Sequence, residues 1–370
     1  MSIHAPLDFR VLANPSVRHL TPYQPGKPLE ELERELGIKN AIKLASNENP
    51  LGASPKVILK MQSALQKMHF YPDGHCFELK QALSHFLSID SQQITVGNGS
   101  ENILELIVKS YLQKEDTAVI SQYAFLTIPI ILNSYGIQIK VAPANQFGHS
   151  ISEMIKAIDE KTRVLFLVNP NNPTGTYTNK NDFLTLMNAI PPHVLVVVDE
   201  AYAEYIGSPD YPNTFHYLNH YPNLVITRTF SKAYGLAGLR LGYAVSSVEI
   251  SDILNRARLP FNVNSLASTA AQFALEDQEH VKKSIQLNQQ GMQQVEIELK
   301  KLNLPFIPST CNFITIDVQD AKTVYHQLLL EGVIVRPLHA YDMQKHIRVT
   351  IGTAEQNKRF LEALHKIMKT

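Results

Sequence analysis

The strongest constraint on the fold of this chain is a series of short segments that are apolar along most of their length. A strand with one face in water alternates apolar and polar residues, whereas a strand buried on both faces does not. Segments with helical spacing lie between them, so the sequence predicts an α/β fold with a mostly parallel sheet covered by helices. The predicted strands are QITV (93–96), TAVIS (117–121), RVLFLV (163–168), VLVVVD (194–199), LVITRT (224–229) and LGYAV (241–245).

The 370 residues are enough for two domains that share one body. We expect residues 1–50 to form an extended arm, with a short helix at 28–36, and to contribute to a small domain. Residues 51–262 are predicted to form the large domain, and residues 263–370 the rest of the small α+β domain. A long helix around 280–302 carries an apolar stripe that we expect to be buried by packing.

The composition argues against several classes of protein. The chain has 34 basic and 34 acidic residues, so its net charge gives no reason to expect nucleic acid or an anionic membrane as a partner. No run of about 18 apolar residues is present, and the first ten residues lack the apolar core of a signal peptide. Cys76 and Cys311 form no CxxC pair, and the histidines form no HExxH motif. We therefore expect a cytoplasmic protein without a disulfide framework or a metal site.

The segment TVGNGSEN, residues 95–102, is the first of four that suggest a bound ligand. A strand is predicted to end at Val96, a Gly-x-Gly turn follows, and Ser100 and Glu101 begin a helix. Glycine allows the backbone to approach a ligand closely, and the free amides of a helix N-terminus favour an anion such as phosphate. Many strand-to-helix turns have the same composition, so an ordinary turn is the alternative.

The second and third segments follow two of the predicted strands. In NPNNPTGTY (169–177), Asn172 precedes a proline and is expected to be extended, with its amide at the strand end where α/β sheets bind ligands. The alternative is a turn made of turn-forming residues. In VLVVVDEAYAEY (194–205), Asp199 ends an apolar strand, and Tyr202 lies three residues further on. A buried carboxylate is costly without a partner, so Asp199 is expected either to pair with a cation or to cap a helix.

The fourth segment, RTFSKAYGLAGLRLG (228–242), contains a single lysine among small residues. Burial and nearby cations lower the pKa of an amine and free its lone pair, so Lys232 is a candidate nucleophile toward a carbonyl group. Ser231 and Arg240 can both hold a phosphate, Arg240 through a charge-assisted fork. A solvated surface lysine is the alternative, which the surrounding glycine and hydroxyl residues oppose.

The four segments together require a ligand with four different groups. These are a phosphate, a ring nitrogen that an acid can pair with, a ring oxygen for an amide or phenol donor, and an aldehyde for a lysine. Pyridoxal 5′-phosphate has all four. Each protein group comes from a separate strand end, and these ends face one crevice in a parallel sheet. Asp199 would keep the pyridine nitrogen protonated, so that the ring can accept electrons from a substrate carbanion.

The segment TFSKAYGLAG (229–238) resembles the lysine-attachment signature of the class I and II aminotransferases, which have fold type I of the pyridoxal-phosphate enzymes. The order of the phosphate turn, Asn-Pro-Thr-Gly, Asp-x-x-Tyr, Ser-Lys and Arg is also the order of that family. Three further segments make the chain similar to the histidinol-phosphate aminotransferases of histidine biosynthesis. They are VRHLTPYQPGKP (17–28), KLASNENPLG (43–52) and YPDG (71–74).

The resemblance implies how the cofactor phosphate is held. Ser100 and Glu101 would donate backbone amides, Ser231 a hydroxyl and Arg240 a guanidinium. Tyr71 would reach the phosphate of the neighbouring subunit's cofactor, so the resemblance also implies a homodimer. Glu101 departs from the pattern, because close relatives often carry aspartate there. If only the backbone amide of Glu101 contacts the phosphate, this difference does not affect binding. The role of its side chain stays open.

The resemblance also implies roles around the cofactor ring and the substrate. Tyr123 would stack on the ring, Asp199 would bond the ring nitrogen, and Asn172 and Tyr202 the ring oxygen. Lys232 would carry the cofactor and act as general base and acid in proton transfer. The residues expected to face the substrate are Tyr23, Asn47, Arg336 and Arg348.

The activity implied is transfer of the amino group of L-histidinol phosphate to 2-oxoglutarate, giving imidazole acetol phosphate and L-glutamate by a ping-pong mechanism. Two enzymatic alternatives are an aromatic amino acid aminotransferase and a threonine-phosphate decarboxylase. A third alternative, from another class, is a regulator that senses a ligand with an aminotransferase-like domain. That function requires a DNA-binding domain, for which no segment is left over.

Overall fold

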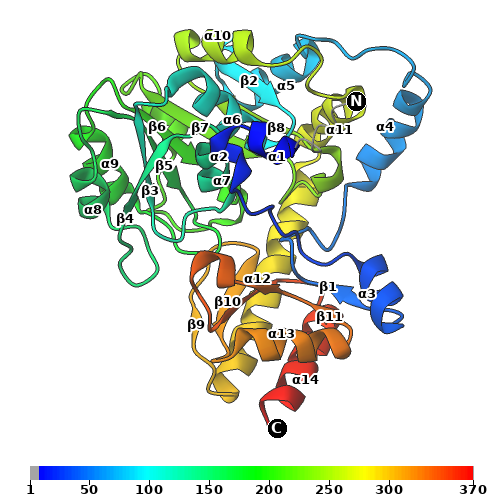
Figure 1. The fold of residues 1–370 in the computed structure, drawn as a ribbon. Helices are drawn as coiled ribbons and strands as arrows, with labels where there is room; N and C mark the ends of the chain where they lie inside the picture. Colours follow the sequence, from blue (N-terminus) through cyan, green and yellow to red (C-terminus); the bar gives the residue numbers. More distant parts are fainter. Residues whose placement is uncertain (1–7, 370) are drawn as a thin grey trace, which may run out of the picture.

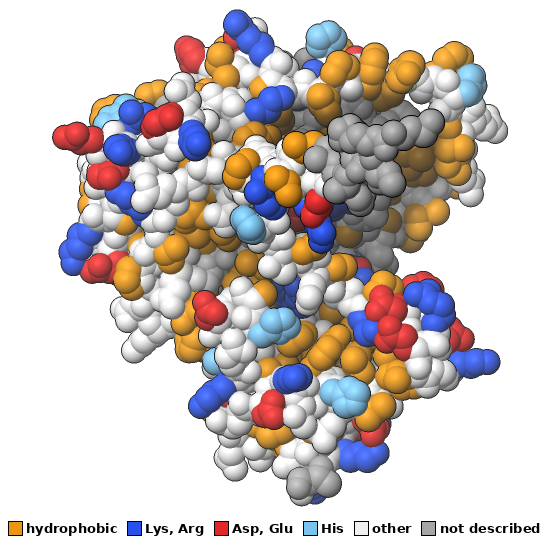
Figure 2. Space-filling model, viewed as in Figure 1, with side chains coloured by type: hydrophobic (Ala, Val, Ile, Leu, Met, Phe, Trp, Pro, Cys, Tyr) orange, Lys and Arg blue, Asp and Glu red, His pale blue; other side chains and the backbone are white. Residues whose placement is uncertain are grey.

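The computed structural model describes residues 8–369, so the first residues of the expected arm (1–7) lie outside it. Figure 1 shows a larger part, layered around one sheet with helices on both sides, and a smaller part that holds the C-terminus. On the face seen in Figure 2, acidic and basic side chains are intermingled, as expected for a chain with balanced charge. None of the helices between residues 8 and 369 combines the length and the apolar character that a membrane crossing demands.

The sheet of the larger part has seven strands, of which β8 runs opposite to the other six. Every residue of β3, β6 and β8 is buried, which explains why their sequences do not alternate. The predicted mostly parallel sheet is therefore confirmed. In sheet order the strands are β2 (Ile94–Gly97), β8 (Gly242–Val245), β7 (Leu224–Thr229), β6 (Leu195–Asp199), β5 (Thr162–Val168), β3 (Thr117–Ser121) and β4 (Gln138–Ala142).

Alternate residues of each central strand face two different hydrophobic cores. In β6, Val196 and Val198 belong to one core, and Leu195 and Val197 belong to the other. We call the side of Val196 and Val198 the α9 face and the side of Leu195 and Val197 the α6 face. Because side chains alternate along a strand, the side chain of Asp199 also lies on the α6 face. The α9 face is covered by α4 (Pro55–Leu65), α5 (Phe77–Leu87), α8 (Ile151–Lys156), α9 (Lys180–Ala189) and α11 (Ser265–Glu276), and the α6 face by α6 (Ser100–Tyr111), α7 (Thr127–Ser134) and α10 (Val248–Ala257).

The smaller part is built on a four-stranded antiparallel sheet, covered by α13 (Ala321–Leu330) and α14 (Ala354–Met368). The N-terminal segment contributes α3 (Leu29–Leu36) and β1 (Ile42–Lys43), which pairs in parallel with β11 (Val333–Ile334). The order of the antiparallel strands is β12 (Arg336–Pro337), β13 (His346–Thr350), β10 (Phe313–Asp317) and β9 (Phe306–Ile307).

The helix predicted at 280–302 is confirmed as α12 (Gln278–Lys301). Its buried stripe spans two cores, since Val281 packs under the large sheet and Val295 and Leu299 pack in the smaller part. The helix therefore links the two parts, as Figure 1 shows. The two packing environments explain why one apolar stripe continues along the helix.

Three features differ from or add to the expectations. The edge strand β4 was not predicted, because its residues alternate polar and apolar and only Ala142 is buried, unlike the continuous apolar runs of the central strands. The arm begins with two short helices, α1 (Phe9–Leu12) and α2 (Pro15–Arg18), where an extended chain was expected. α11 lies beyond residue 262 yet packs on the large-sheet core. The boundaries at residues 50 and 262 stay predictions.

Candidate active site

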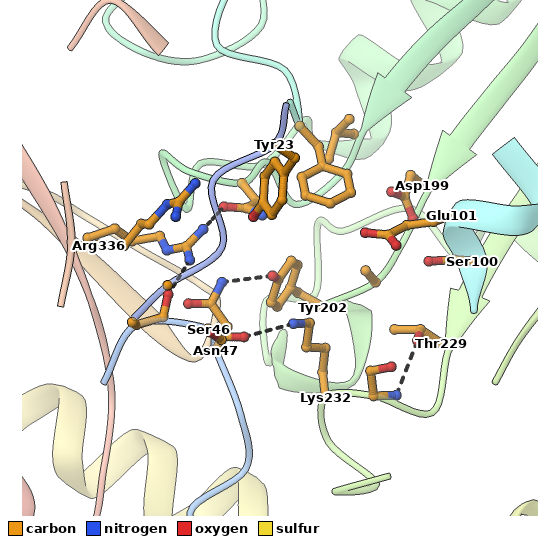
Figure 3. A pocket seen from close by; sticks show the side chains of 18 of the residues that line it. Tyr23, Ser46, Asn47, Ser100, Glu101, Asp199, Tyr202, Thr229, Lys232 and Arg336 are labelled. Atoms are coloured by element: carbon orange, nitrogen blue, oxygen red, sulfur yellow. Dashed lines mark hydrogen bonds between the residues drawn. The ribbon is translucent and has the colours of Figure 1, made fainter. Parts of the chain in front are cut away.

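A cavity of about 200 Å³ lies at the carboxyl ends of β5, β6 and β7, between the large sheet and the smaller part. This edge of an α/β sheet is where ligands bind. Figure 3 shows Lys232 and Tyr202 between two groups, with Tyr23 and Arg336 on one side and Ser100, Glu101 and Asp199 on the other. The predicted site residues that line the cavity are Tyr23, Asn47, Ser100, Glu101, Asn172, Asp199, Tyr202, Ser231, Lys232, Arg240, Arg336 and Arg348.

The N-terminus of α6 forms one end of the cavity. Gly242 is required beside it, because a Cβ at that position would lie 2.3 Å from the backbone nitrogen of Ser100. Arg240 comes from the other side, and its Nη1 lies 3.4 Å from the Ser231 hydroxyl. Free helix amides, a hydroxyl and a guanidinium at one point suit a phosphate group. The arrangement favours a phosphate site, rather than an ordinary turn, as the interpretation of this segment.

Asp199 occupies the last position of β6 and is buried. Its Oδ1 accepts a hydrogen bond of 2.9 Å from the Thr227 hydroxyl. Removal from water raises the pKa of Asp199 to about 6, and the charges of Glu101 and Glu200 act in the same direction. The next helical turn has Tyr202 as its N-cap residue, so Asp199 does not cap a helix there. Pairing with a cation, such as a protonated ring nitrogen, is the interpretation that remains.

Asn172 and Tyr202 are held by hydrogen bonds from residues of other segments. Nη1 of Arg348 donates to Oδ1 of Asn172 at 2.5 Å, which leaves the NH₂ group of the amide for an acceptor in the cavity. Nδ2 of Asn47 donates to the Tyr202 hydroxyl at 2.8 Å, and the hydroxyl proton is then free to bond another acceptor. Burial raises the pKa of Tyr202, so its hydroxyl keeps that proton at neutral pH. Both residues can therefore donate to one ring oxygen.

Lys232 lines the cavity together with Arg240 and Arg348. Its Nζ donates to the backbone oxygen of Ser46 at 3.1 Å and lies 5.6 Å from the centre of the Tyr202 ring. Removal from water, and to a lesser degree the charge of Arg348, lowers the pKa of Lys232 to about 8. An amine with this pKa is partly neutral at physiological pH and can attack an aldehyde.

The cavity carries more positive than negative charge. Four cationic side chains and two carboxylates line it. Arg348 is 7% exposed, and its hydrogen bonds go to the neutral oxygens of Asn172 and Ala45. Its buried Nε has no partner among the described residues. A buried cation without a counter-ion is costly, so this position is suited to an anionic ligand. The residues present therefore fit pyridoxal 5′-phosphate and an anionic substrate together.

Two predicted site residues, Tyr123 and Tyr71, do not line the cavity. The ring of Tyr123 packs against Phe147, with 5.7 Å between ring centroids, and does not line the cavity. Phe125, two residues further along the same turn, does line it. Phe125 is therefore placed better than Tyr123 to lie against a ring in the cavity, and the stacking role expected of Tyr123 stays a prediction. Aromatic residues occur at both positions of the sequence, and only the backbone of the turn after β3 shows which ring faces the site.

Tyr71 is the second residue outside the cavity. It is 83% exposed, and its ring stacks on Phe261 with 4.7 Å between centroids. In this position it cannot contact a ligand in the cavity of its own chain. Its expected role toward a neighbouring subunit stays a prediction.

Comparison with known proteins identifies the family. Residues 39–364 match the model of aminotransferase class I and II. Histidinol-phosphate aminotransferase 2 of Pseudomonas fluorescens is 50% identical over 98% of both chains, and histidinol-phosphate aminotransferase 1 of Nitrosococcus oceani is 48% identical over 98% of both. The crystal structure of histidinol-phosphate aminotransferase from Sinorhizobium meliloti in complex with pyridoxal 5′-phosphate has a TM-score of 0.88 and 26% identity, covering 96% of this chain and 97% of that one.

The chain belongs to the class I and II aminotransferase family, whose members use pyridoxal 5′-phosphate. Within that family it falls with the histidinol-phosphate aminotransferases, which are its relatives at about half identity over nearly the full length. The predicted fold, cofactor and family are therefore confirmed.

Proposed function

We propose that this protein transfers the amino group of L-histidinol phosphate to 2-oxoglutarate, giving imidazole acetol phosphate and L-glutamate, in histidine biosynthesis. The observation that carries the proposal is the Arg348 guanidinium, which is buried in the same cavity as Lys232 and has no carboxylate partner within residues 8–369. The names of the relatives supply the amino donor. Both substrates are anionic, and each needs a cation opposite the reactive amine.

Pyridoxal 5′-phosphate supplies an aldehyde and an electron-accepting ring when it is bound. Lys232 would bond the aldehyde carbon, Asp199 the ring nitrogen, and Asn172 and Tyr202 the ring oxygen. Phe125 would lie against the ring. The groups that would hold the phosphate are the backbone amides of Ser100 and Glu101, the Ser231 hydroxyl and the Arg240 guanidinium.

Three residues of the chain carry the chemical step in this proposal. Asp199 would pair with the ring nitrogen and keep it protonated, because a carboxylate in a dry site favours a charged partner. Lys232 would act as general base and acid for the proton of the substrate Cα, and its lowered pKa suits both directions of that transfer. Tyr202 would donate to the ring oxygen and hold the ring in place.

Arg348 and Arg336 are proposed to bind the anionic end of each substrate. A planar guanidinium can pair through two hydrogen bonds with either a phosphate or a carboxylate, which suits a site that takes two unlike molecules in turn. Arg336 and Arg348 are register partners on β12 and β13, so both come from one edge of the small sheet. The arm lies over Arg336, whose guanidinium bonds the backbone oxygen of Gln24 and lies 5.2 Å from the Tyr23 ring.

We also propose that the active unit is a homodimer in the cytoplasm. A monomer seldom exposes large apolar side chains close together, yet α4 and the segment after it do so. Two free, buried cysteines are in keeping with a reducing compartment. The exposed apolar residues of this region are Ile58, Leu59, Met68, Phe70, Tyr71 and Phe77.

The proposed substrate is tested with a panel of amino donors. The purified protein is mixed with each donor, and the conversion of the cofactor is followed by its absorption spectrum. L-Histidinol phosphate should react best, and histidinol without its phosphate should be much poorer, because it lacks the group that the arginines bind. Faster reaction with phenylalanine or tyrosine would instead support an aromatic aminotransferase. Release of carbon dioxide from threonine phosphate, without a keto acid, would support a decarboxylase.

A further inference from the structure

A buried charged cluster lies directly behind Asp199, on the α9 face of the sheet. Glu200 follows β6 and its side chain is fully buried, while Arg228 belongs to β7 and its side chain is 15% exposed. Nε of Arg228 donates to Oε2 of Glu200 at 2.8 Å, and Nη2 forms an ion pair with the same oxygen at 2.7 Å. Neither residue lines the cavity, because alternate side chains of a strand point to opposite faces.

The other oxygen of Glu200 is also fully used. Oε1 accepts from the Thr214 hydroxyl at 2.8 Å and lies 3.1 Å from the Tyr211 hydroxyl. The Tyr211 hydroxyl also lies 2.7 Å from the backbone oxygen of Asn169, which follows β5. The cluster therefore connects the segment after β5, the segment after β6, and β7 itself.

Arg228 is fixed from two further sides. Its Nη1 lies 3.2 Å from a carboxylate oxygen of Glu204, and its guanidinium lies 5.0 Å from the centre of the Phe215 ring. A guanidinium held by two carboxylates and an aromatic face has one orientation, because its donors are coplanar. The position of β7 relative to β6 is thus set by directional contacts as well as by packing.

The cluster meets the backbone on both sides of Asp199. The backbone nitrogen of Asn169 donates to the backbone oxygen of Asp199 at 2.9 Å. The backbone nitrogen of Glu200 donates to the backbone oxygen of Thr227, also at 2.9 Å. The Thr227 hydroxyl then donates to the Asp199 carboxylate. Four residues beyond Arg228 the same segment carries Lys232. A shift of any of these strand ends would move Asp199 relative to Lys232.

Stability alone does not account for a buried ion pair at this place. Two charges lose their hydration when they are buried, and apolar side chains of the same volume often pack equally well. Unlike apolar packing, the pair makes directional contacts that fix the orientation of the groups it joins. We propose that the Glu200–Arg228 pair is a positioning unit for the reaction, which holds the ends of β5, β6 and β7 so that the Asp199 carboxylate and the Lys232 amine keep fixed relative places.

The test compares Arg228→Met with Arg163→Met. Arg163 lies in β5 at the opposite end of the same sheet and pairs with Asp116 at 3.4 Å, so its variant controls for the loss of an ion pair. Each protein is loaded with pyridoxal 5′-phosphate, and kcat, KM and the visible circular dichroism of the cofactor are measured. Arg228→Met should lower kcat by about tenfold to a hundredfold, with KM within about threefold, since small misplacements of catalytic groups are costly. It should also change the visible dichroism, whereas Arg163→Met should match the wild type.

A second variant keeps the inference testable if Arg228→Met does not fold. The double variant Glu200→Gln/Arg228→Met removes both charges of the pair, and Glu204, whose pKa burial already raises, is the carboxylate that loses its cation. Its thermal midpoint shows whether it folds. A folded double variant with lowered kcat and altered dichroism supports the inference, and one with wild-type kcat and dichroism overturns it. Arg228→Lys keeps the charge but loses the planar fork, and should restore kcat only in part.

This inference rests on the proposed cofactor site, and the same assays separate the two. If the wild-type protein shows no cofactor dichroism and no transamination, the proposed function fails. If the wild type shows both and the Arg228 variants equal it, only the positioning role fails.

Discussion

Replacement of Arg348 by methionine removes the buried guanidinium while keeping a long side chain. The guanidinium donates to Asn172 and to the backbone of Ala45, and its buried Nε has no partner among the described residues. If both substrates bind there through their anionic ends, both half-reactions lose the same contact. The variant therefore distinguishes a shared anion site from two separate ones.

The expected loss follows from the number and kind of contacts. One charge-assisted hydrogen bond contributes about 1.5–3 kcal/mol. Loss of one such bond lowers kcat/KM by roughly one to two orders of magnitude. A bidentate pair would add to this, and release of the Asn172 amide would disturb the ring oxygen as well. We therefore expect a fall of at least about tenfold with either substrate.

The assay follows each half-reaction separately through the cofactor spectrum, once with L-histidinol phosphate and once with L-glutamate. Arg359→Met is the matched control, because Arg359 is also in the smaller part and bonds backbone oxygens of Asn40 and Glu331. The control should retain both rates. A fall in only one half-reaction, or no fall beyond about threefold in either, would refute the shared anchor.

Three further predictions concern the cofactor side of the cavity. Asp199→Asn should still bind pyridoxal 5′-phosphate but lose about two orders of magnitude or more in kcat, because an amide does not hold the ring nitrogen protonated; near-normal turnover would contradict this. The pKa of Lys232, about 8, predicts that cofactor capture by the cofactor-free protein accelerates as pH rises through 8 and then levels off, because only the neutral amine attacks. Stopped-flow absorbance checks this, and a rate that rises only toward the ordinary lysine value of 10.5 would speak against the lowered pKa. Subunit exchange between Lys232→Ala and Tyr71→Phe parents should give heterodimers with one intact site if Tyr71 acts across the interface; no gain in activity after mixing would argue against that role.

The sequence predicted the parts of this protein that follow from periodicity and from chemistry at strand ends. Continuous apolar runs predicted the buried strands, and Lys232 and Asp199 stood out because polar groups follow those runs directly. The edge strand β4 was missed because the prediction rested on continuous apolar runs, whereas QIKVA (138–142) alternates polar and apolar residues. Alternation of this kind is the pattern of a partly exposed strand and could have revealed β4.

Other features depend on geometry that no local pattern carries. Tyr123 and Phe125 are two aromatic residues after the same strand, and the turn between them decides which one faces the cavity. The Glu200–Arg228 pair joins residues that are 28 positions apart. Glu200 follows the motif residue Asp199 directly, so its side chain is expected on the opposite face of the sheet. Its pairing with Arg228 could be predicted only if β6 and β7 were already known to be neighbours.

Reduction with borohydride tests the central claim most directly. The reagent fixes the bond between pyridoxal phosphate and the lysine that carries it, and peptide mapping by mass spectrometry then locates the pyridoxyl group. The cavity at the ends of β5, β6 and β7, with the lowered pKa of its amine, predicts that the group is found on Lys232. A pyridoxyl group on any other lysine, with none on Lys232, would contradict the account.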